Sequence, residues 1–307
     1  MTHRITMLIL SGAIALATGV VRAETIYVGL LLSDTSPPYL QFADALKKSL
    51  STAKTDAAIV ESQAAGSGIR ADLIVAVGMK ATEMAAAQNG TPMLVAMVPE
   101  AGYKKLIAQA SHQKPGRQIS AIYLNQPWAR QIDFLQAVLP RRHRIGLLFS
   151  PDAGIDVESL RKQVTGRGGS LVAVSVQPGG KFFPGLESVL ESSDMLLTVP
   201  DSAIYNNSNI RNILLTSYRK GVPIVGLSQP YVNAGALCAV FSTIEQMAEQ
   251  TATAVDSFSR SRHLPEPQYP SGFTVAVNLQ VARSLGIDIP SPEEIRNRMG
   301  KGGRWKK

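Results

Sequence analysis

Cysteine is almost absent from the chain, because Cys238 is the only one among 307 residues. A single thiol cannot close an intramolecular disulfide, and it cannot form a zinc site built from cysteines. Cys238 lies within the apolar run Ala236 to Phe241, which indicates a buried core thiol. We therefore expect hydrophobic cores, and not covalent cross-links, to hold the fold together.

Histidines are few, and none stands where catalysis would need one. A general base is expected at the end of a strand, whereas the histidines lie near the N-terminus, in a polar loop and in two basic, linker-like stretches. They are His3, His112, His143 and His263. No paired metal motif is present, and Gly226 to Pro230 misses the nucleophile motif G-x-S-x-G because its last residue is proline. These absences predict no catalytic residue, no metal ligand and no enzymatic activity.

A dinucleotide site is not expected either. The segment Gly66 to Ala71 matches the fingerprint G-x-G-x-x-G/A, whose glycines open a phosphate-binding helix. The next predicted strand begins near Leu73, and this leaves no room for such a helix. We interpret the glycines as a tight connection and predict no cofactor.

The formal charge of +8 gathers at the two ends of the chain. The segment after Pro292 holds six Lys and Arg residues against two Glu residues, and Arg4 and Arg22 lie near the N-terminus. The body between the ends is therefore close to neutral. The interleaving of aromatic and basic residues that single-strand binders use is missing. We interpret residues 291–307 as a solvated basic tail and predict no nucleic-acid partner.

The first residues have the form of a secretory signal peptide. An apolar run from Ile5 to Val21 follows Arg4, and Val21-Arg22-Ala23 has the small-x-small form that signal peptidase cuts. Polar and glycine residues interrupt the run, which is shorter than the roughly 20 strongly apolar residues that a membrane span needs. We predict that residues 1–23 are removed after Ala23 and that the mature chain lies in the periplasm.

Apolar runs of strand length alternate with amphipathic stretches of helical length along the rest of the chain. This pattern is typical of parallel strands covered on both faces by crossover helices. The predicted strands are Ile26 to Leu32, Ala57 to Val60, Leu73 to Val77, Met93 to Met97, Ile119 to Tyr123, Arg144 to Phe149, Leu171 to Val176, Met195 to Val199, Pro223 to Gly226, Ala236 to Phe241 and Phe273 to Val277. The predicted helices include Tyr39 to Leu50, Pro127 to Val138, Val157 to Thr165, Asn207 to Lys220 and Ile244 to Arg260. With a break near Pro140 to His143, we predict an α/β fold of two Rossmann-like lobes with parallel sheets.

Polar loops follow many of the predicted strands. In an open parallel sheet the ligand binds beyond the carboxyl ends of the strands, so these loops predict hydrogen-bonding recognition of a small molecule. Acids stand in four of them, at Asp34, Glu100, Asp152 and Asp201. Asp152 and Asp201 could cap the helices that follow them, or one of the four acids could meet a ligand. We favour the cap for Asp152, and both roles stay open for Asp201.

Several segments, in order along the chain, resemble the substrate-binding proteins of ABC transporters, and most closely the group of tryptophan and tyrosine binders. They are Asp72 to Gly78, Arg144 to Phe149, Val199 to Asp201, Gly221 to Gly226, Ala234 to Leu237 and Val277 to Gly286. The resemblance implies a type I periplasmic binding fold, in which two lobes joined by three crossings close over a ligand by hinge motion. It also implies domain bounds: lobe 1 over residues 24–124 plus 243–262, and lobe 2 over 125–242 plus 268–290.

The chain departs from the resembled family at several strand ends, and two of these departures bear most on the ligand. Gly78-Met79-Lys80 replaces the usual Gly-Thr-Pro, and Ser228 to Tyr231 lacks the usual acidic residue. Unless Asp201 or Asp34 compensates, a ligand ammonium would stay unpaired at a high cost in free energy, so we expect a less cationic ligand, with Tyr205 or Tyr231 stacking on it. The predicted ligand-binding residues are Ser33, Asp34, Met79, Asn125, Gln126, Asp201, Tyr205, Ser228, Gln229 and Tyr231.

Two hypotheses of function remain beside the disfavoured enzyme. In the first, the protein is a monomeric periplasmic solute-binding protein that takes a small polar or aromatic ligand to an ABC permease. In the second, the same fold serves as a ligand-sensing or accessory subunit that signals to another membrane partner. The sequence does not separate them, although a permease and an ATPase encoded next door would favour the first.

Overall fold

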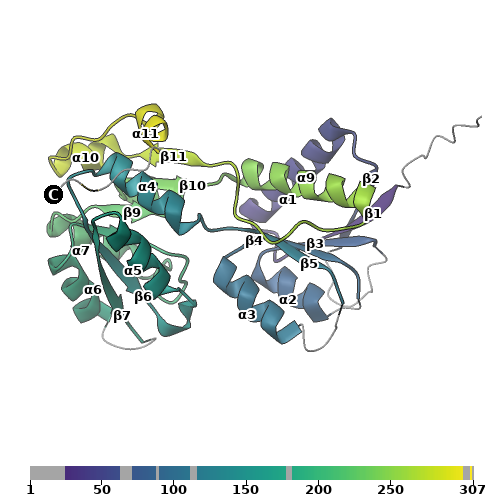
Figure 1. Ribbon diagram of the computed structural model, residues 1–307, viewed down its shortest axis with the longest axis horizontal. Helices are drawn as coiled ribbons and strands as arrows, with labels where there is room; N and C mark the ends of the chain where they lie inside the picture. Colours follow the sequence, from purple (N-terminus) through teal and green to yellow (C-terminus); the bar gives the residue numbers. More distant parts are fainter. Residues whose placement is uncertain are drawn as a thin grey trace, which may run out of the picture.

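The computed structural model describes residues 25–62, 71–87, 90–110, 116–177, 182–299 and 305. The predicted signal peptide, residues 66–70 of the glycine segment and His112 lie outside the described residues, as does most of the tail after Met299. The chain forms two α/β lobes, each built around its own sheet, and Figure 1 shows them side by side along the long axis. The two-lobe α/β prediction is thereby confirmed.

The sheet of lobe 1 has the strand order β2-β1-β3-β4-β5, and every pairing in it is parallel. The strands are β1 (Ile26–Leu32), β2 (Ala57–Ser62), β3 (Leu73–Val77), β4 (Met93–Val98) and β5 (Ile119–Tyr123). Helices α1 (Pro37–Ala53) and α9 (Ile244–Ser261) pack together on one face, and α2 (Met79–Ala87) and α3 (Glu100–Ala110) lie on the other (Figure 1). The central strands are apolar throughout because helices cover both of their faces.

The sheet of lobe 2 has the order β11-β10-β9-β8-β6-β7. Its strands are β6 (Arg144–Phe149), β7 (Ser170–Ser175), β8 (Met195–Leu197), β9 (Ile224–Gly226), β10 (Cys238–Phe241) and β11 (Thr274–Val277). Its helices are α4 (Trp128–Val138), the short turn η1 (Pro151–Ala153), α5 (Val157–Gly166), α6 (Phe182–Glu191), α7 (Ile210–Arg219), α8 (Gln229–Ala234), α10 (Leu279–Ser284) and α11 (Pro292–Arg298). Cys238 is buried in this lobe, as predicted, and burial raises the pKa of its thiol.

The edge strand β11 runs antiparallel to β10, which the prediction of parallel sheets missed. The chain reaches β11 from lobe 1 and not through a crossover helix packed on the same sheet. A strand parallel to β10 would need such a crossover. The antiparallel direction of β11 therefore follows from its connection, which arrives from lobe 1.

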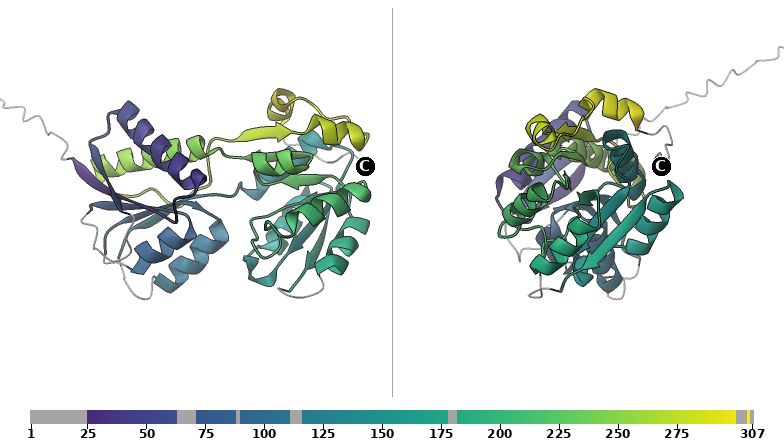
Figure 2. Two further views of the ribbon diagram at one scale, coloured as in Figure 1. Left: turned by 180° about the vertical axis from the view of Figure 1, so that it is seen from behind. Right: turned by 90° about the vertical axis from the view of Figure 1, so that its left-hand side faces the viewer.

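The chain passes between the lobes three times: after β5, after β10 and before β11. The third crossing lies against β5, where the N–H of Tyr123 donates to the carbonyl of Gln268 at 2.9 Å and the N–H of Gln268 donates to Ala121 at 2.8 Å. The second crossing ends at a capping box: Thr243 accepts from the N–H of Gln246, whose side chain accepts in turn from the N–H of Thr243. This reciprocal cap fixes where α9 begins. Figure 2 shows the extended segments bridging the lobes.

The predicted basic tail is partly folded onto lobe 2. Helix α11 packs against α4, and Ile295, in the middle of α11, is buried. Trp305 is only 5% exposed, its ring lies against Gly169, and its backbone N–H donates to the carbonyl of Arg167 at 2.9 Å. Apolar residues within the basic segment therefore anchor it, which the interpretation as a solvated tail did not foresee.

Candidate ligand-binding site

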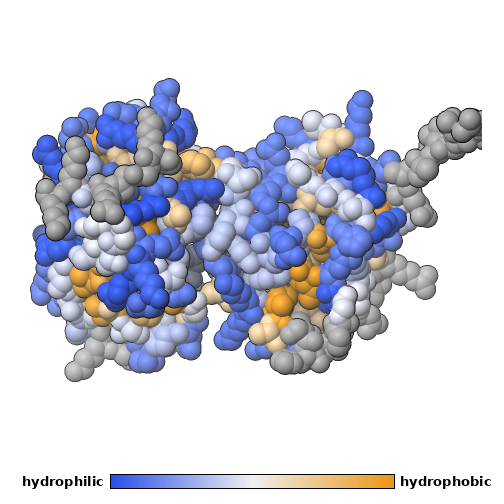
Figure 3. Space-filling view, in the orientation of Figure 1, coloured by the Kyte–Doolittle hydropathy of each residue, from blue (hydrophilic) through white to orange (hydrophobic). Residues whose placement is uncertain are grey.

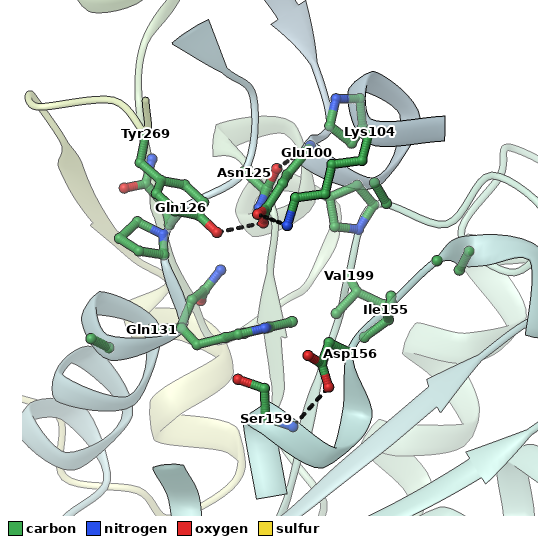
Figure 4. A pocket seen from close by; sticks show the side chains of 18 of the residues that line it. Glu100, Lys104, Asn125, Gln126, Gln131, Ile155, Asp156, Ser159, Val199 and Tyr269 are labelled. Carbon is green, nitrogen blue, oxygen red and sulfur yellow. Dashed lines mark hydrogen bonds and ion pairs between the residues drawn. The ribbon is translucent and has the colours of Figure 1, made fainter. Parts of the chain in front are cut away.

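A pocket of about 350 Å³ lies between the lobes, close to the crossings. That volume falls in the range of small-molecule sites. Its walls come from the start of α3 in lobe 1, the starts of α4 and α5 in lobe 2, and the crossing segments that carry Asn125, Gln126 and Tyr269. Figure 3 shows a narrow, mostly hydrophilic waist between the two lobes, and Figure 4 shows the pocket from close by.

Glu100, the first residue of α3, holds a carboxylate on the lobe 1 side of the pocket. Its oxygens accept hydrogen bonds from the hydroxyl of Tyr269 and from Lys104, whose Nζ lies 2.7 Å away (Figure 4). The hydrogen bond that Lys104 donates to Glu100 raises the pKa of Lys104. Burial, and then the bond to Glu100, raise the pKa of the Tyr269 hydroxyl. The carboxylate is therefore fixed and compensated before any ligand arrives.

Asn125 connects α3 to the first crossing. Its Oδ1 accepts from the N–H of Glu100 at 2.8 Å, and so caps the start of α3. Tyr269 is supported from behind by a row of rings, because Tyr123 lies 5.2 Å from it and Tyr103 lies 5.6 Å from Tyr123, centroid to centroid. Aromatic packing of this kind makes a rigid wall.

The lobe 2 side begins with the loop before α5. Asp156 is the N-cap of α5 and accepts from the N–H of Ser159 at 2.8 Å. Just before it, Gly154 has φ +64°, and a Cβ added there would lie 2.9 Å from the Cβ of Ala101 in α3. The two lobes therefore touch at this glycine.

Trp128 and Gln131, both in the first turn and a half of α4, complete the pocket. The N-cap of α4 is Pro127, which offers no side-chain acceptor. Gln131 is 7% exposed, and its Oε1 has no hydrogen-bond partner within the described part of the chain.

A polar network joins the three crossings behind the pocket. The amide of Gln126 donates to Ser242 Oγ at 2.9 Å and accepts from Arg130 at 2.5 Å. Arg130 also donates to the carbonyl of Pro270 at 2.7 Å, and Ser242 donates to the carbonyl of Gly272 at 2.6 Å. Gln126, which is 4% exposed, thus lines the pocket and links the first crossing to the other two.

Of the predicted ligand-binding residues, Asn125 and Gln126 line the pocket. Three others lie at strand ends of lobe 1, outside its lining. Ser33 Oγ donates to the carbonyl of Val77 at 2.9 Å and accepts from the N–H of Ala81 at 3.0 Å, which fixes the start of α2. Asp34 is exposed, and hydrogen bonds from Ser36 lower its pKa. Met79 packs against α3 at Gly102.

The remaining five lie at strand ends of lobe 2, also outside the lining of this pocket. Asp201 is 5% exposed and accepts from the N–H of Ser150 at 2.6 Å, from Ser150 Oγ at 3.1 Å and from the N–H of Ala203 at 3.0 Å. It therefore caps the turn that follows β8 and ties that turn to the end of β6.

Tyr205 is buried, and its hydroxyl donates to the carbonyl of Leu148 at 3.0 Å; burial raises its pKa. The hydroxyl of Tyr231 donates to the carbonyl of Tyr205 at 3.3 Å. Ser228 is the N-cap residue of α8, and Gln229 in its first turn donates to Asn233 at 2.8 Å.

The expectation that Asp152 caps the following helix is wrong. Asp152 lies in the short turn η1, and Gly154 in the left-handed conformation follows it. The helix therefore starts later, and Asp156 is its cap.

The expectation that ligands bind beyond the carboxyl ends of strands did not identify the pocket residues that come from helices or crossings. Lys104 stands four residues after Glu100, a helical spacing at which opposite charges pair, and this signal was available in the sequence. Trp128, Gln131 and Tyr269 gave no such signal, because their approach depends on how the lobes are joined.

The family model described as ABC transporter substrate binding protein matches residues 41–300. The chain belongs to this family. The resemblance noted in the sequence is thereby confirmed, and so is the expectation that the chain is not an enzyme, because members of this family are ligand binders. No protein of curated function matches the sequence.

Solved structures agree with the fold of this substrate-binding protein. A conserved domain protein from Vibrio cholerae shares 19% identity at a TM-score of 0.64, covering 90% of this chain and 99% of its own. An ABC domain from Streptococcus pneumonia in complex with L-Trp shares 18% identity at a TM-score of 0.62, covering 89% and 99%. A ligand-free, open substrate-binding protein with adhesive properties from Clostridium difficile shares 15% identity at a TM-score of 0.67, covering 92% and 99%. The fold is that of the type I periplasmic binding proteins.

Within the described segments, no helix has both the length and the apolar character that a membrane span requires.

Proposed function

We propose that this substrate-binding protein works in the periplasm, as a monomer, and captures a small polar or aromatic ligand in the inter-lobe pocket for delivery to an ABC permease. The observation that carries the proposal is the pocket itself, since its walls come from both lobes and from the crossings between them. A ligand there contacts both lobes at once and so favours their closed arrangement. The N-terminal leader pattern supports export.

The pocket supports a ligand with a ring or an apolar part beside its polar groups. Trp128 and Tyr269 supply aromatic surface, and Ile155 and Val199 add aliphatic surface from lobe 2. The polar groups on the walls are mostly satisfied by partners of the protein's own, as at Glu100 and Asn125. Such a wall suits recognition by fixed hydrogen bonds and offers no reactive pair for bond breaking.

We further propose the lobe bounds that the resemblance implies, with residues 24–124 and 243–262 moving against residues 125–242 and 268–290. The contact between Gly154 and Ala101 joins the lobes directly, whereas the network of Gln126, Arg130 and Ser242 joins the crossings. In closure, the two lobes rotate about the crossings, and the distance between Gly154 and Ala101 changes.

The test is native mass spectrometry of the protein purified from periplasm, followed by a thermal-shift screen of amino acids, carboxylates and other metabolites. A ligand that binds only the folded state raises the melting temperature. We expect one bound small molecule, with its stabilisation reduced in Trp128→Ala and kept in Tyr218→Ala, which removes an exposed aromatic residue of α7. If no solute binds, transport of a small ligand is wrong, and the role of a sensing or accessory subunit for a membrane partner replaces it.

A further inference from the structure

The net charge of the chain is gathered in two segments of lobe 2. Outside the predicted signal peptide, which holds Arg4 and Arg22, the chain has 29 Lys and Arg residues against 23 Asp and Glu residues, a net charge of +6. Residues 140–144 and 283–307 hold ten of these cations and three of the acids, and Asp194 accepts hydrogen bonds from Arg144. We call the two segments together with Asp194 the basic end. Its net charge is also +6, so the rest of the chain is balanced.

The structure brings the two segments of the basic end together. Residues 140–142, which follow α4, and residues 286–291, which precede α11, line one groove of about 600 Å³. Arg298 of α11 also donates to the carbonyl of Ala137 in α4 at 3.5 Å. Figures 1 and 2 show α10 and α11 together on one side of lobe 2. Cations far apart in the sequence therefore share one surface.

Trp305 fastens the last part of the chain to the same end of the lobe. Its buried ring lies against Gly169, directly before Ser170, which pairs with Arg144 in the register of β6 and β7. Consecutive Cα atoms are only about 3.8 Å apart, so a buried anchor near the C-terminus ties its neighbours in sequence to the basic end. Four cations that lie outside the described residues stand within four positions of Trp305: Lys301, Arg304, Lys306 and Lys307.

Several of the described cations are exposed and available to a partner. Arg141, Arg283 and Arg296 are exposed, and within the described residues none of them forms an ion pair, unlike Arg144 with Asp194 or Arg298 with Glu294. Cations in the last turn of a helix interact favourably with the helix dipole, which accounts for the arginines at the ends of α10 and α11. That local role does not account for Arg141 or for the tail.

The basic end lies away from the inter-lobe pocket. Trp128, the first residue of α4, lines the pocket, whereas Arg141 follows the last turn of the same helix. The 11 residues of α4 span about 16 Å. A partner at the basic end therefore has no need to cover the pocket.

We propose that the basic end is a docking surface for a membrane that carries anionic phospholipids. Charge complementarity carries this proposal, because a bilayer offers many phosphates to cations that are spread over two segments and a tail. Nucleic acid is disfavoured, since Trp305 is the only Phe, Trp or Tyr of the basic end and its buried ring cannot stack on a base. Cys238, the only cysteine, is buried as well, so charge and not a lipidated cysteine holds the protein at the bilayer.

The experiment is co-sedimentation of the protein purified from periplasm with lipid vesicles. One set of vesicles contains equal parts of phosphatidylglycerol and phosphatidylcholine, and the other contains phosphatidylcholine alone. We expect binding to the anionic vesicles only, with a loss of roughly tenfold or more between physiological salt and about 1 M, where the screening length falls from about 8 Å to about 3 Å. Glycerol phosphate, the free headgroup, should not compete at the concentration of the vesicle lipid.

Two double variants and a matched control make the test specific. Arg141→Gln with Arg296→Gln, and separately Lys306→Gln with Lys307→Gln, each remove two charges from the basic end. Each pair should weaken binding to the anionic vesicles by roughly 25-fold, or about fivefold per charge. Lys48→Gln with Lys105→Gln makes the same charge change at exposed residues of lobe 1 and should weaken binding by no more than roughly threefold, because those charges lie beyond the screening length.

The membrane surface is refuted if the anionic vesicles do not bind the protein, or if they bind it no better than phosphatidylcholine vesicles do. Competition by glycerol phosphate would also refute it and would show a discrete phosphate site instead. A lobe 1 control that loses as much binding as the two basic-end variants would contradict the location. None of these measurements involves capture of a solute, so their outcome is independent of the proposed function.

Discussion

The contact between Gly154 and Ala101 predicts that one methyl group can hold the lobes apart. In Gly154→Ala, the new Cβ would lie 2.9 Å from the Cβ of Ala101, which is closer than real carbon contacts allow. The residue also has φ +64°, where a side chain costs roughly 1–2 kcal/mol. Two effects are therefore expected: a strain that lowers the free energy of unfolding, and a clash that opposes the approach of the lobes.

A matched control separates the two effects. Gly221 has φ +67°, and a Cβ there would meet nothing within 4 Å, so Gly221→Ala carries the strain without the clash. We expect both variants to lose roughly 1–2 kcal/mol of unfolding free energy in urea. Gly154→Ala alone should weaken binding of the ligand identified in the periplasmic protein, by roughly fivefold or ~1 kcal/mol.

The double variant Gly154→Ala with Ala101→Gly completes the cycle. It removes the methyl group that clashes, so ligand affinity should return to that of the natural chain while the strain remains. Isothermal titration calorimetry measures the affinity. Equal affinities of Gly154→Ala and Gly221→Ala would refute the idea that this contact limits closure.

Three further predictions concern the hinge, the C-terminal segment and pH. Gln126→Leu leaves Arg130 and Ser242 each without one buried partner, so urea unfolding should show a loss of ~1–3 kcal/mol; an unchanged midpoint would show that the network adds nothing. Ile295→Ala should cost ~2–5 kcal/mol because Ile295 is fully buried against α4, and a loss below ~0.5 kcal/mol, as at surface sites, would mean that the tail is not part of the core. Burial acts to raise the pKa of Asp194, but hydrogen bonds from Arg144 and from the N–H of His143 outweigh it and lower the pKa; the stabilisation is therefore present at neutral pH and lost as pH falls through the lowered pKa. Asp194→Asn should flatten the acid limb of stability measured by urea unfolding against pH, and an unaltered limb would contradict this.

The strands could be predicted closely from sequence where apolar residues are continuous. Ile26–Leu32, Leu73–Val77, Ile119–Tyr123 and Arg144–Phe149 have the bounds that the sequence indicates, because a strand buried on both faces leaves little freedom in composition. The direction of β11 could not be predicted, since it depends on a crossing from the other lobe.

The residues of the pocket could be predicted less well from the sequence than the strands. The rule that ligands bind at strand ends placed Asn125 and Gln126 on its wall. The same rule also selected Ser33 and Asp201, whose hydrogen bonds serve the turns of their own lobes. Whether a strand-end side chain holds a turn or faces the other lobe depends on tertiary packing, which local sequence does not encode.

Small-angle X-ray scattering with and without the captured ligand tests most directly the claim that two lobes close on a small molecule. The radius of gyration should fall when the ligand is added to the natural chain, and it should fall less in Gly154→Ala. A radius that stays the same at saturating ligand would contradict closure of the lobes over this pocket.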